Sequence, residues 1–122
     1  MQKELTFGTF LTQRRKVKSI SLRGFASNVE LSPVYMCDIE KDRRRAPAQD
    51  ILDKMAEALH LSDQDRLLMY DLAAKTKNTV PVDLPEYIME REIVKVALRT
   101  AKELDATDKE WQEFINRLSN RD

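Results

Sequence analysis

Apolar residues recur at intervals of three and four in almost every part of this chain. The clearest run is Trp111, Phe114, Ile115 and Leu118, which follow the i, i+3, i+4, i+7 spacing of one helix face. The 122 residues include only two Gly and four Pro, too few for the many turns of an all-β protein. The pattern therefore predicts an all-α protein, and a hydrophobic fraction of 42% is enough to form a core.

Ser and Thr residues of the kind that cap helix N-termini divide the chain into predicted helices. Five of them stand directly before an apolar periodic run: Thr6, Ser21, Ser32, Ser62 and Thr107. Pro33 stands at a first helical position, where a missing N–H group costs nothing. The predicted helices cover residues 7–16, 22–29, 33–40, 49–60, 63–74, 86–104 and 108–119.

The segment 75–85, KTKNTVPVDLP, has two prolines and no helical period, so we expect a linker there. It separates a predicted domain at residues 1–74 from a predicted pair of helices at residues 86–122. Charge is also unevenly distributed: residues 1–50 carry ten Lys or Arg and six Asp or Glu, and residues 51–122 carry eleven and fifteen. A net +4 followed by a net −4 favours a polyanion-binding module with a different element attached.

Several classes of protein are disfavoured by what the sequence lacks. A single cysteine, Cys37, excludes a disulfide within the chain and is consistent with a reducing cytosol. No apolar run approaches the roughly 18 residues of a membrane span, and the N-terminus has no signal-peptide pattern. His60 has no second His or Cys at ligand spacing, and two glycines cannot form a phosphate-binding loop. We therefore expect a cytoplasmic protein that is not an enzyme and carries no metal or cofactor.

The most informative stretch is residues 20–40, ISLRGFASNVELSPVYMCDIE, which contains two short predicted helices joined by a tight turn. A basic run, KDRRR, follows it directly. The major groove of DNA admits one α-helix, whose first turn must then offer side chains to the base edges. With Ser32 as the N-cap, the exposed positions are Pro33, Val34, Cys37 and Asp38, with Lys41 just beyond. The predicted recognition helix is therefore about Ser32–Glu40.

This arrangement resembles the helix-turn-helix of the Xre/Cro family, the class of the lambdoid phage repressors. The resemblance covers about Thr6 to Ala74, and these residues carry it: Ser21, Phe25, Ala26, Ser32, Ile39 and Glu40. It implies a five-helix lambda-repressor-like domain that binds a specific sequence of double-stranded DNA and represses transcription. The sequence departs from the family pattern in three places. Glu30 stands where the turn often has Gly, and Ala48 stands where a capping Ser or Thr is expected. The predicted recognition helix also lacks the Gln, Asn or Arg that make bidentate base contacts.

The predicted DNA-binding face combines base-reading and phosphate-binding positions. Val34 and Pro33 suit thymine methyl groups, and Asp38 suits a cytosine amino group. Helix N-termini at Ser21 and Ser32 offer N–H groups to phosphates, and the basic run lies where the family contacts the DNA backbone. The full predicted face is Ser21, Arg23, Ser32, Pro33, Val34, Cys37, Asp38, Lys41, Arg43, Arg44 and Arg45.

Arg15 and Glu40 have a separate interpretation. The resemblance places them at the positions of a buried Arg–carboxylate pair that ties the first helix to the third. The alternative is that they contact base or phosphate.

The predicted C-terminal helices carry more apolar surface than one helix pair needs. Packing against each other as a hairpin would bury much of it, and the surplus has three possible uses: the first domain, a second copy or another protein. The candidate dimer or partner residues are Ile93, Leu98, Trp111, Phe114, Ile115 and Leu118. This tail also resembles Xre-type antitoxins or immunity repressors that accompany ImmA/IrrE-type metallopeptidases. The alternative function is therefore an antitoxin or interaction module that neutralises a toxin or metallopeptidase encoded nearby.

Overall fold

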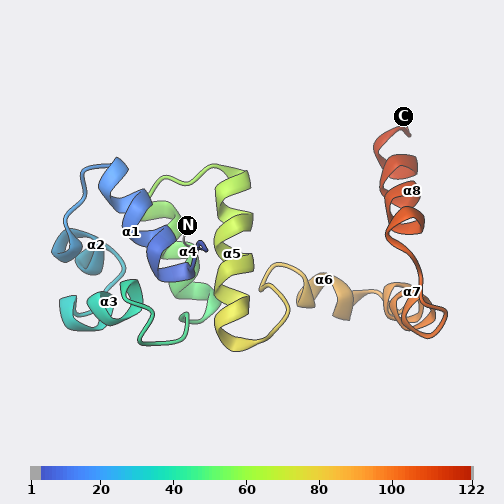
Figure 1. Ribbon diagram of the computed structural model, residues 1–122, viewed down its shortest axis with the longest axis horizontal. Helices are drawn as coiled ribbons and strands as arrows, with labels where there is room; N and C mark the ends of the chain where they lie inside the picture. The colour runs from blue at the N-terminus through green and yellow to red at the C-terminus, as the bar shows by residue number, and fades with distance from the viewer. Residues whose placement is uncertain (1–3, 122) are drawn as a thin grey trace. The chain divides into compact units, whose positions relative to one another are not determined.

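The computed structural model of the chain describes residues 4–121, so residues 1–3 and 122 of the predicted domains lie outside the described residues. All the regular secondary structure of the described residues is α-helix, without a strand (Figure 1). The chain divides into two compact units between Leu84 and Pro85. The first unit contains α1 (Phe7–Val17), α2 (Leu22–Asn28), α3 (Pro33–Glu40), α4 (Gln49–Ala58) and α5 (Asp63–Lys77). The second contains α6 (Pro85–Glu90), α7 (Glu92–Glu103) and α8 (Asp108–Ser119). No helix in the described range 4–121 has both the length and the apolar content that a membrane span requires.

Side-chain caps begin most of the helices at the positions that the sequence predicts. The hydroxyl oxygens of Thr6, Ser21, Ser32 and Ser62 each accept a hydrogen bond from the backbone N–H three residues later. Thr107 forms a reciprocal capping box with Glu110 at the start of α8. Ala48 makes no side-chain cap at the start of α4, as its methyl group dictates.

Large apolar side chains from all five helices of the first unit form one core. α1 packs on α3 and α5, and α2 packs on α3 and α4. The side chains that are less than 2% exposed are Phe7, Phe10, Leu11, Phe25, Val29, Met36, Ile39, Leu52, Met55, Leu59 and Met69. This core fixes α2 and α3 as neighbours at one end of the unit (Figure 1).

Within residues 4–121, six helices are followed by a non-glycine residue in the left-handed conformation. Glycine usually takes this position, but Gly8 and Gly24 both lie inside helices. The six left-handed residues are Ser19, Glu30, Asp42, His60, Asn78 and Asp105, with φ between 51° and 61°. In the ending at Asp42, the N–H of Arg43 donates to the carbonyl of Asp38 (2.9 Å), which is the Schellman pattern. This ending turns the chain back toward α3.

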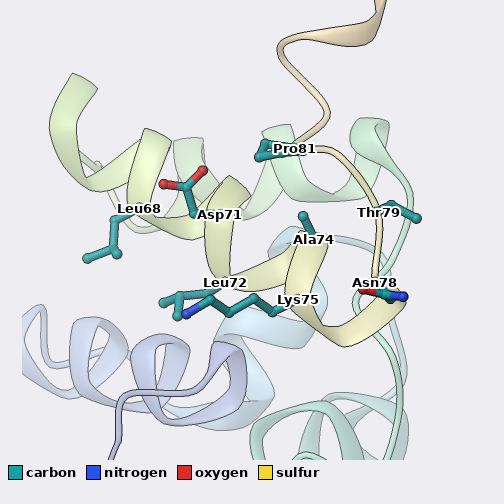
Figure 2. A pocket seen from close by; sticks show the side chains of 8 residues that line it. All are labelled: Leu68, Asp71, Leu72, Ala74, Lys75, Asn78, Thr79 and Pro81. Carbon is teal, nitrogen blue, oxygen red and sulfur yellow. The ribbon is translucent and has the colours of Figure 1, made fainter. Parts of the chain in front are cut away.

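The predicted linker at residues 75–85 is partly wrong. α5 continues to Lys77 and ends at Asn78, because the first proline of the segment comes only at Pro81. Beyond it, the Thr79 N–H donates to the Ala74 carbonyl (3.1 Å), and Val82 packs against the core. Figure 2 shows this returning segment beside α5, where Asn78, Thr79 and Pro81 line an open groove of about 440 Å³. Residues 78–84 therefore belong to the first unit, and Pro85 begins α6 of the second.

The prediction of one continuous helix at residues 86–104 is also wrong. The backbone is extended at Arg91 (φ −129°, ψ 108°), which separates α6 from α7. The positions three and four residues after Ile88 are Arg91 and Glu92, so the apolar stripe is interrupted there. A straight helix through this point would not keep one apolar face.

The expectation that the C-terminal helices bury much of their apolar surface against each other is wrong for this single chain. None of the described residues in α6, α7 and α8 is buried. A unit of fewer than 40 residues is below the size at which a domain usually builds its own core. Its apolar face therefore needs cover from elsewhere.

Candidate nucleic-acid interface

The turn between α2 and α3 keeps a helix-turn-helix geometry even though it contains no glycine. Glu30 adopts the left-handed conformation (φ 61°), and the Leu31 N–H donates to the Ala26 carbonyl (2.9 Å). For a non-glycine residue this conformation costs about 1 kcal/mol or more of conformational free energy. Val29 is fully buried beside it, and its burial offsets that cost. The departure from the family pattern at Glu30 therefore leaves the turn intact.

α3 has one buried face and one exposed face. Met36, Ile39 and Glu40 are buried against the core. On the opposite side Ser32, Pro33 and Val34 are exposed, with 74% of Val34 accessible. Cys37 and Asp38 are half-buried, so they are less accessible than the sequence suggests. The first turn of α3 is the part of this helix that is free to approach a ligand.

Ser21 and Arg23 lie at the exposed start of α2. The Ser21 hydroxyl accepts from the Gly24 N–H (3.0 Å), and the Ser32 hydroxyl accepts from the Tyr35 N–H (3.1 Å). Each hydroxyl keeps its own O–H group, because a serine can accept and donate at once. Both caps can therefore hold their helix and still donate to a phosphate oxygen.

The basic loop, residues 41–45, is exposed at every position. It contains one acidic residue, Asp42, whose carboxylate accepts hydrogen bonds from the start of α1. That carboxylate accepts from the Thr6 hydroxyl (2.6 Å) and from the Gly8 N–H (2.9 Å) at the start of α1. A carboxylate at a helix N-terminus is stabilised by the helix dipole. The carboxylate of Asp42 thus stabilises the start of α1.

Asp38 has partners that the sequence analysis missed. One carboxylate oxygen lies 3.6 Å from Arg43 Nη1, and the other lies 3.8 Å from Arg44 Nε. The Arg44 guanidinium also lies over the Tyr35 ring, 4.7 Å from its centre. Arg43 and Arg44 follow Asp38 by five and six residues, across the end of α3. Side chains at this spacing meet only when the chain turns back after the helix, so the spacing alone did not reveal these ion pairs. Asp38 faces arginines instead of standing free to meet a base.

The structure brings Arg15 and Glu40 together. Glu40 accepts from Arg15 Nε (2.8 Å), from Arg15 Nη2 (2.9 Å) and from the Thr12 hydroxyl (2.9 Å). The hydrogen bonds to Glu40 raise the pKa of Arg15 further above its ordinary value. The side chains are 12% and 5% exposed, which removes both from the surface where DNA would bind. The alternative of a direct base or phosphate contact by this pair therefore loses support.

The six candidate residues of the C-terminal helices are all exposed. The accessible fractions are 66% for Ile93, 40% for Leu98, 36% for Trp111, 52% for Phe114, 51% for Ile115 and 44% for Leu118. Trp111 and Phe114 contact each other edge to face, with ring centres 6.1 Å apart. These exposed apolar side chains are candidates for an interaction surface.

No protein-family model matches the chain, and no curated protein matches it. Among solved structures, the chain is similar to one described as a SinR protein/SinI protein complex. The two chains are 20% identical, and the match covers 93% of this chain and 95% of the other with a TM-score of 0.47. A likeness at this level carries no argument about what the present chain does.

Proposed function

We propose that this protein binds double-stranded DNA through α2, α3 and the basic loop, and that it acts as a transcriptional repressor and not as an enzyme. The observation that carries the proposal is the exposed first turn of α3 beside exposed Lys41, Arg43, Arg44 and Arg45. The acidic residues of α3 and the basic loop, Asp38, Glu40 and Asp42, all have partners within the protein, and Glu30 in the preceding turn pairs with Lys54. The surface that remains is basic beside a helix that fits a major groove.

In this arrangement α3 lies in the major groove and the loop lies along the DNA backbone. Val34 is the best placed reader, since its exposed methyl groups suit a thymine methyl. Lys41 and the three arginines neutralise phosphates and contribute affinity for any sequence. The Arg15–Glu40 pair holds the end of α3 against α1 and so fixes the position of the loop.

The test uses duplexes enriched by the full-length protein from a random library. Binding is titrated over a range of salt concentrations for the wild type and for a variant with Arg43, Arg44 and Arg45 changed to Ala. We expect weaker binding to every duplex, and a slope of log K against log salt that flattens by roughly 0.9 for each lost phosphate contact.

The matched control changes Arg91, Lys102 and Lys109 to Ala, which removes the same charge from exposed positions of the second unit. If both triple variants lose affinity and slope equally, net charge alone explains binding and the loop is not the interface. If neither the wild type nor the variants bind any duplex, the proposed function is wrong.

A second function is favoured by the exposed apolar residues of α7 and α8. They suit homodimerisation, or capture of a protein such as a toxin or metallopeptidase encoded nearby, so an antitoxin role is compatible with DNA binding. Co-expression with the product of the adjacent gene tests this: a stable complex that Phe114→Ala disrupts supports it. Failure to co-purify with that product leaves only self-association for this surface.

A further inference from the structure

We propose that Asp38 competes with DNA phosphates for Arg43 and Arg44 and so lowers the affinity of the protein for every duplex. The inference rests on the proposed DNA-binding function, and it replaces the expected role of Asp38 as a cytosine reader. In the free protein its carboxylate occupies the position that a phosphate takes in the complex.

The geometry places one carboxylate between two arginines. Each oxygen of Asp38 faces a different guanidinium, at 3.6 Å for Arg43 and 3.8 Å for Arg44. The backbone hydrogen bond from the Arg43 N–H to the Asp38 carbonyl holds the loop in place for both contacts. Tyr35 limits the directions that Arg44 can take, because the guanidinium lies over its ring.

These two ion pairs are weak enough to exchange. Both separations exceed hydrogen-bond length, and the arginine side chains are 64% and 54% exposed, so solvent screens the attraction. A phosphate offers an arginine shorter, charge-assisted and often bidentate hydrogen bonds. The arginines therefore change partner when DNA approaches, and the Asp38 carboxylate is left beside the DNA with less compensation.

Separating Asp38 from the two arginines costs free energy, and this cost is the same for every duplex. Phosphates are the same in all sequences, so competition from Asp38 lowers non-specific affinity without favouring any base. A true site offsets the penalty through contacts made by the first turn of α3.

The test compares full-length Asp38→Asn with the wild type. Asparagine keeps the shape of the side chain and removes its charge. We expect affinity for an unrelated duplex to rise about four- to twenty-five-fold, from two exposed ion pairs at about two- to fivefold each. The salt slope should steepen by up to about 0.9, the value of one further phosphate contact.

Asp71→Asn is the matched control, because Asp71 is exposed on α5 and loses the same charge. A further control places Asp38→Asn in a chain whose Arg43 and Arg44 are both changed to Ala. If Asp38 acts through the arginines, the substitution has no effect in that background. A gain that persists there overturns the proposal, as does a gain equal to that of Asp71→Asn.

Two other outcomes also overturn it. Weaker binding to all duplexes with a flatter salt slope means that Asp38 positions the arginines for phosphates. A changed preference at one base pair, with unrelated duplexes unaffected, means that Asp38 reads a base. Elution from heparin, a polyanion without base pairs, tests the competition even if the protein does not bind DNA. If no duplex binds, Asp38→Asn should still elute at higher salt than Asp71→Asn, and equal elution rejects the competition itself.

Discussion

The Arg15 guanidinium and the Glu40 carboxylate form two side-by-side hydrogen bonds, of 2.8 and 2.9 Å, that join α1 to the last residue of α3. Arg15 also donates to the Ile20 carbonyl (3.1 Å), which leads into α2. The pair thus links the helix-turn-helix to the scaffold behind it. Since Glu40 directly precedes the basic loop, the same contact sets where that loop begins.

Glu40→Ala should lower the free energy of unfolding by roughly 3–5 kcal/mol, because Arg15 would remain buried without its partner. Denaturant unfolding followed by circular dichroism measures the change. Glu57→Ala is the control, since Glu57 is exposed on α4. A Glu40→Ala protein with unchanged stability and weaker DNA binding would show that the residue acts in recognition instead.

Gly8→Ala should destabilise the protein by about 1–3 kcal/mol, as overpacking of a close contact does. A Cβ atom at Gly8 would lie 2.5 Å from the Glu40 carbonyl oxygen and 2.6 Å from that of Ile39, so α1 would have to move away from α3. At Gly24 the nearest atom is Ser21 Oγ at 3.0 Å, so Gly24→Ala should stay within about 1 kcal/mol of the wild type. Thermal melting of both variants measures the difference in stability. Equal melting points would contradict the close approach of Gly8 to the end of α3.

Local patterns were sufficient for the starts of most helices but not for every helix boundary or for the contacts between helices. Capping residues such as Ser21 and Ser32 act within three residues, so the starts of α2 and α3 could be predicted. The contacts of Asp38 with its partners depend on the left-handed conformation of Asp42. Because Asp42 is not a glycine, the sequence did not predict this conformation. The break at Arg91 was also missed, because neither Gly nor Pro stands at that position and only the interrupted apolar stripe after Ile88 marks it.

Tyr70→Phe should cost about 1 kcal/mol near neutral pH, because the buried Tyr70 hydroxyl donates to Asp53 Oδ1 (2.6 Å). Burial, followed by the hydrogen bond to Asp53, raises the pKa of Tyr70 above 10.0. The folded state therefore retains the proton longer than the unfolded state, and this stability is lost as pH rises above about 10.

The difference in stability between wild type and Tyr70→Phe should accordingly narrow in that alkaline range, since phenylalanine cannot ionise. Chemical unfolding of both proteins between pH 8 and about 11 measures the difference, across the range in which an ordinary tyrosine ionises. A difference that stays constant with pH would mean that Tyr70 ionises equally in both states.

Val34→Ala should change the preference of the protein among duplex sequences without changing its salt slope. Val34 is the most exposed large side chain of α3, and one true base contact is worth about 1–3 kcal/mol. Competition titrations with duplexes that differ at one base pair measure the preference. Lys18→Ala serves as a control from the exposed end of α1. A uniform loss over all duplexes would place Val34 outside base readout.

The protein should bind DNA as a dimer whose interface includes α7 and α8. One helix-turn-helix reads only a half-site, and two recognition helices must lie about 34–36 Å apart to read adjacent turns. The exposed Trp111 and Phe114 give each copy a self-complementary apolar surface of the kind that a two-fold dimer requires. Changing both to Ala in the full-length chain should weaken self-association by about two orders of magnitude or more, since each large apolar side chain contributes roughly 1.5–3 kcal/mol when buried.

Sedimentation velocity over a concentration series measures that loss. The alternative is a dimer interface on α5, which Leu67→Ala tests. Leu67 is 51% exposed on α5, whereas the neighbouring Tyr70 is only 5% exposed and is unavailable to a partner. If Leu67→Ala dissociates the dimer and the α8 double variant does not, α5 makes the interface. Because α7 and α8 would then still have an uncovered apolar face, binding of a different protein would be the remaining explanation for Trp111 and Phe114.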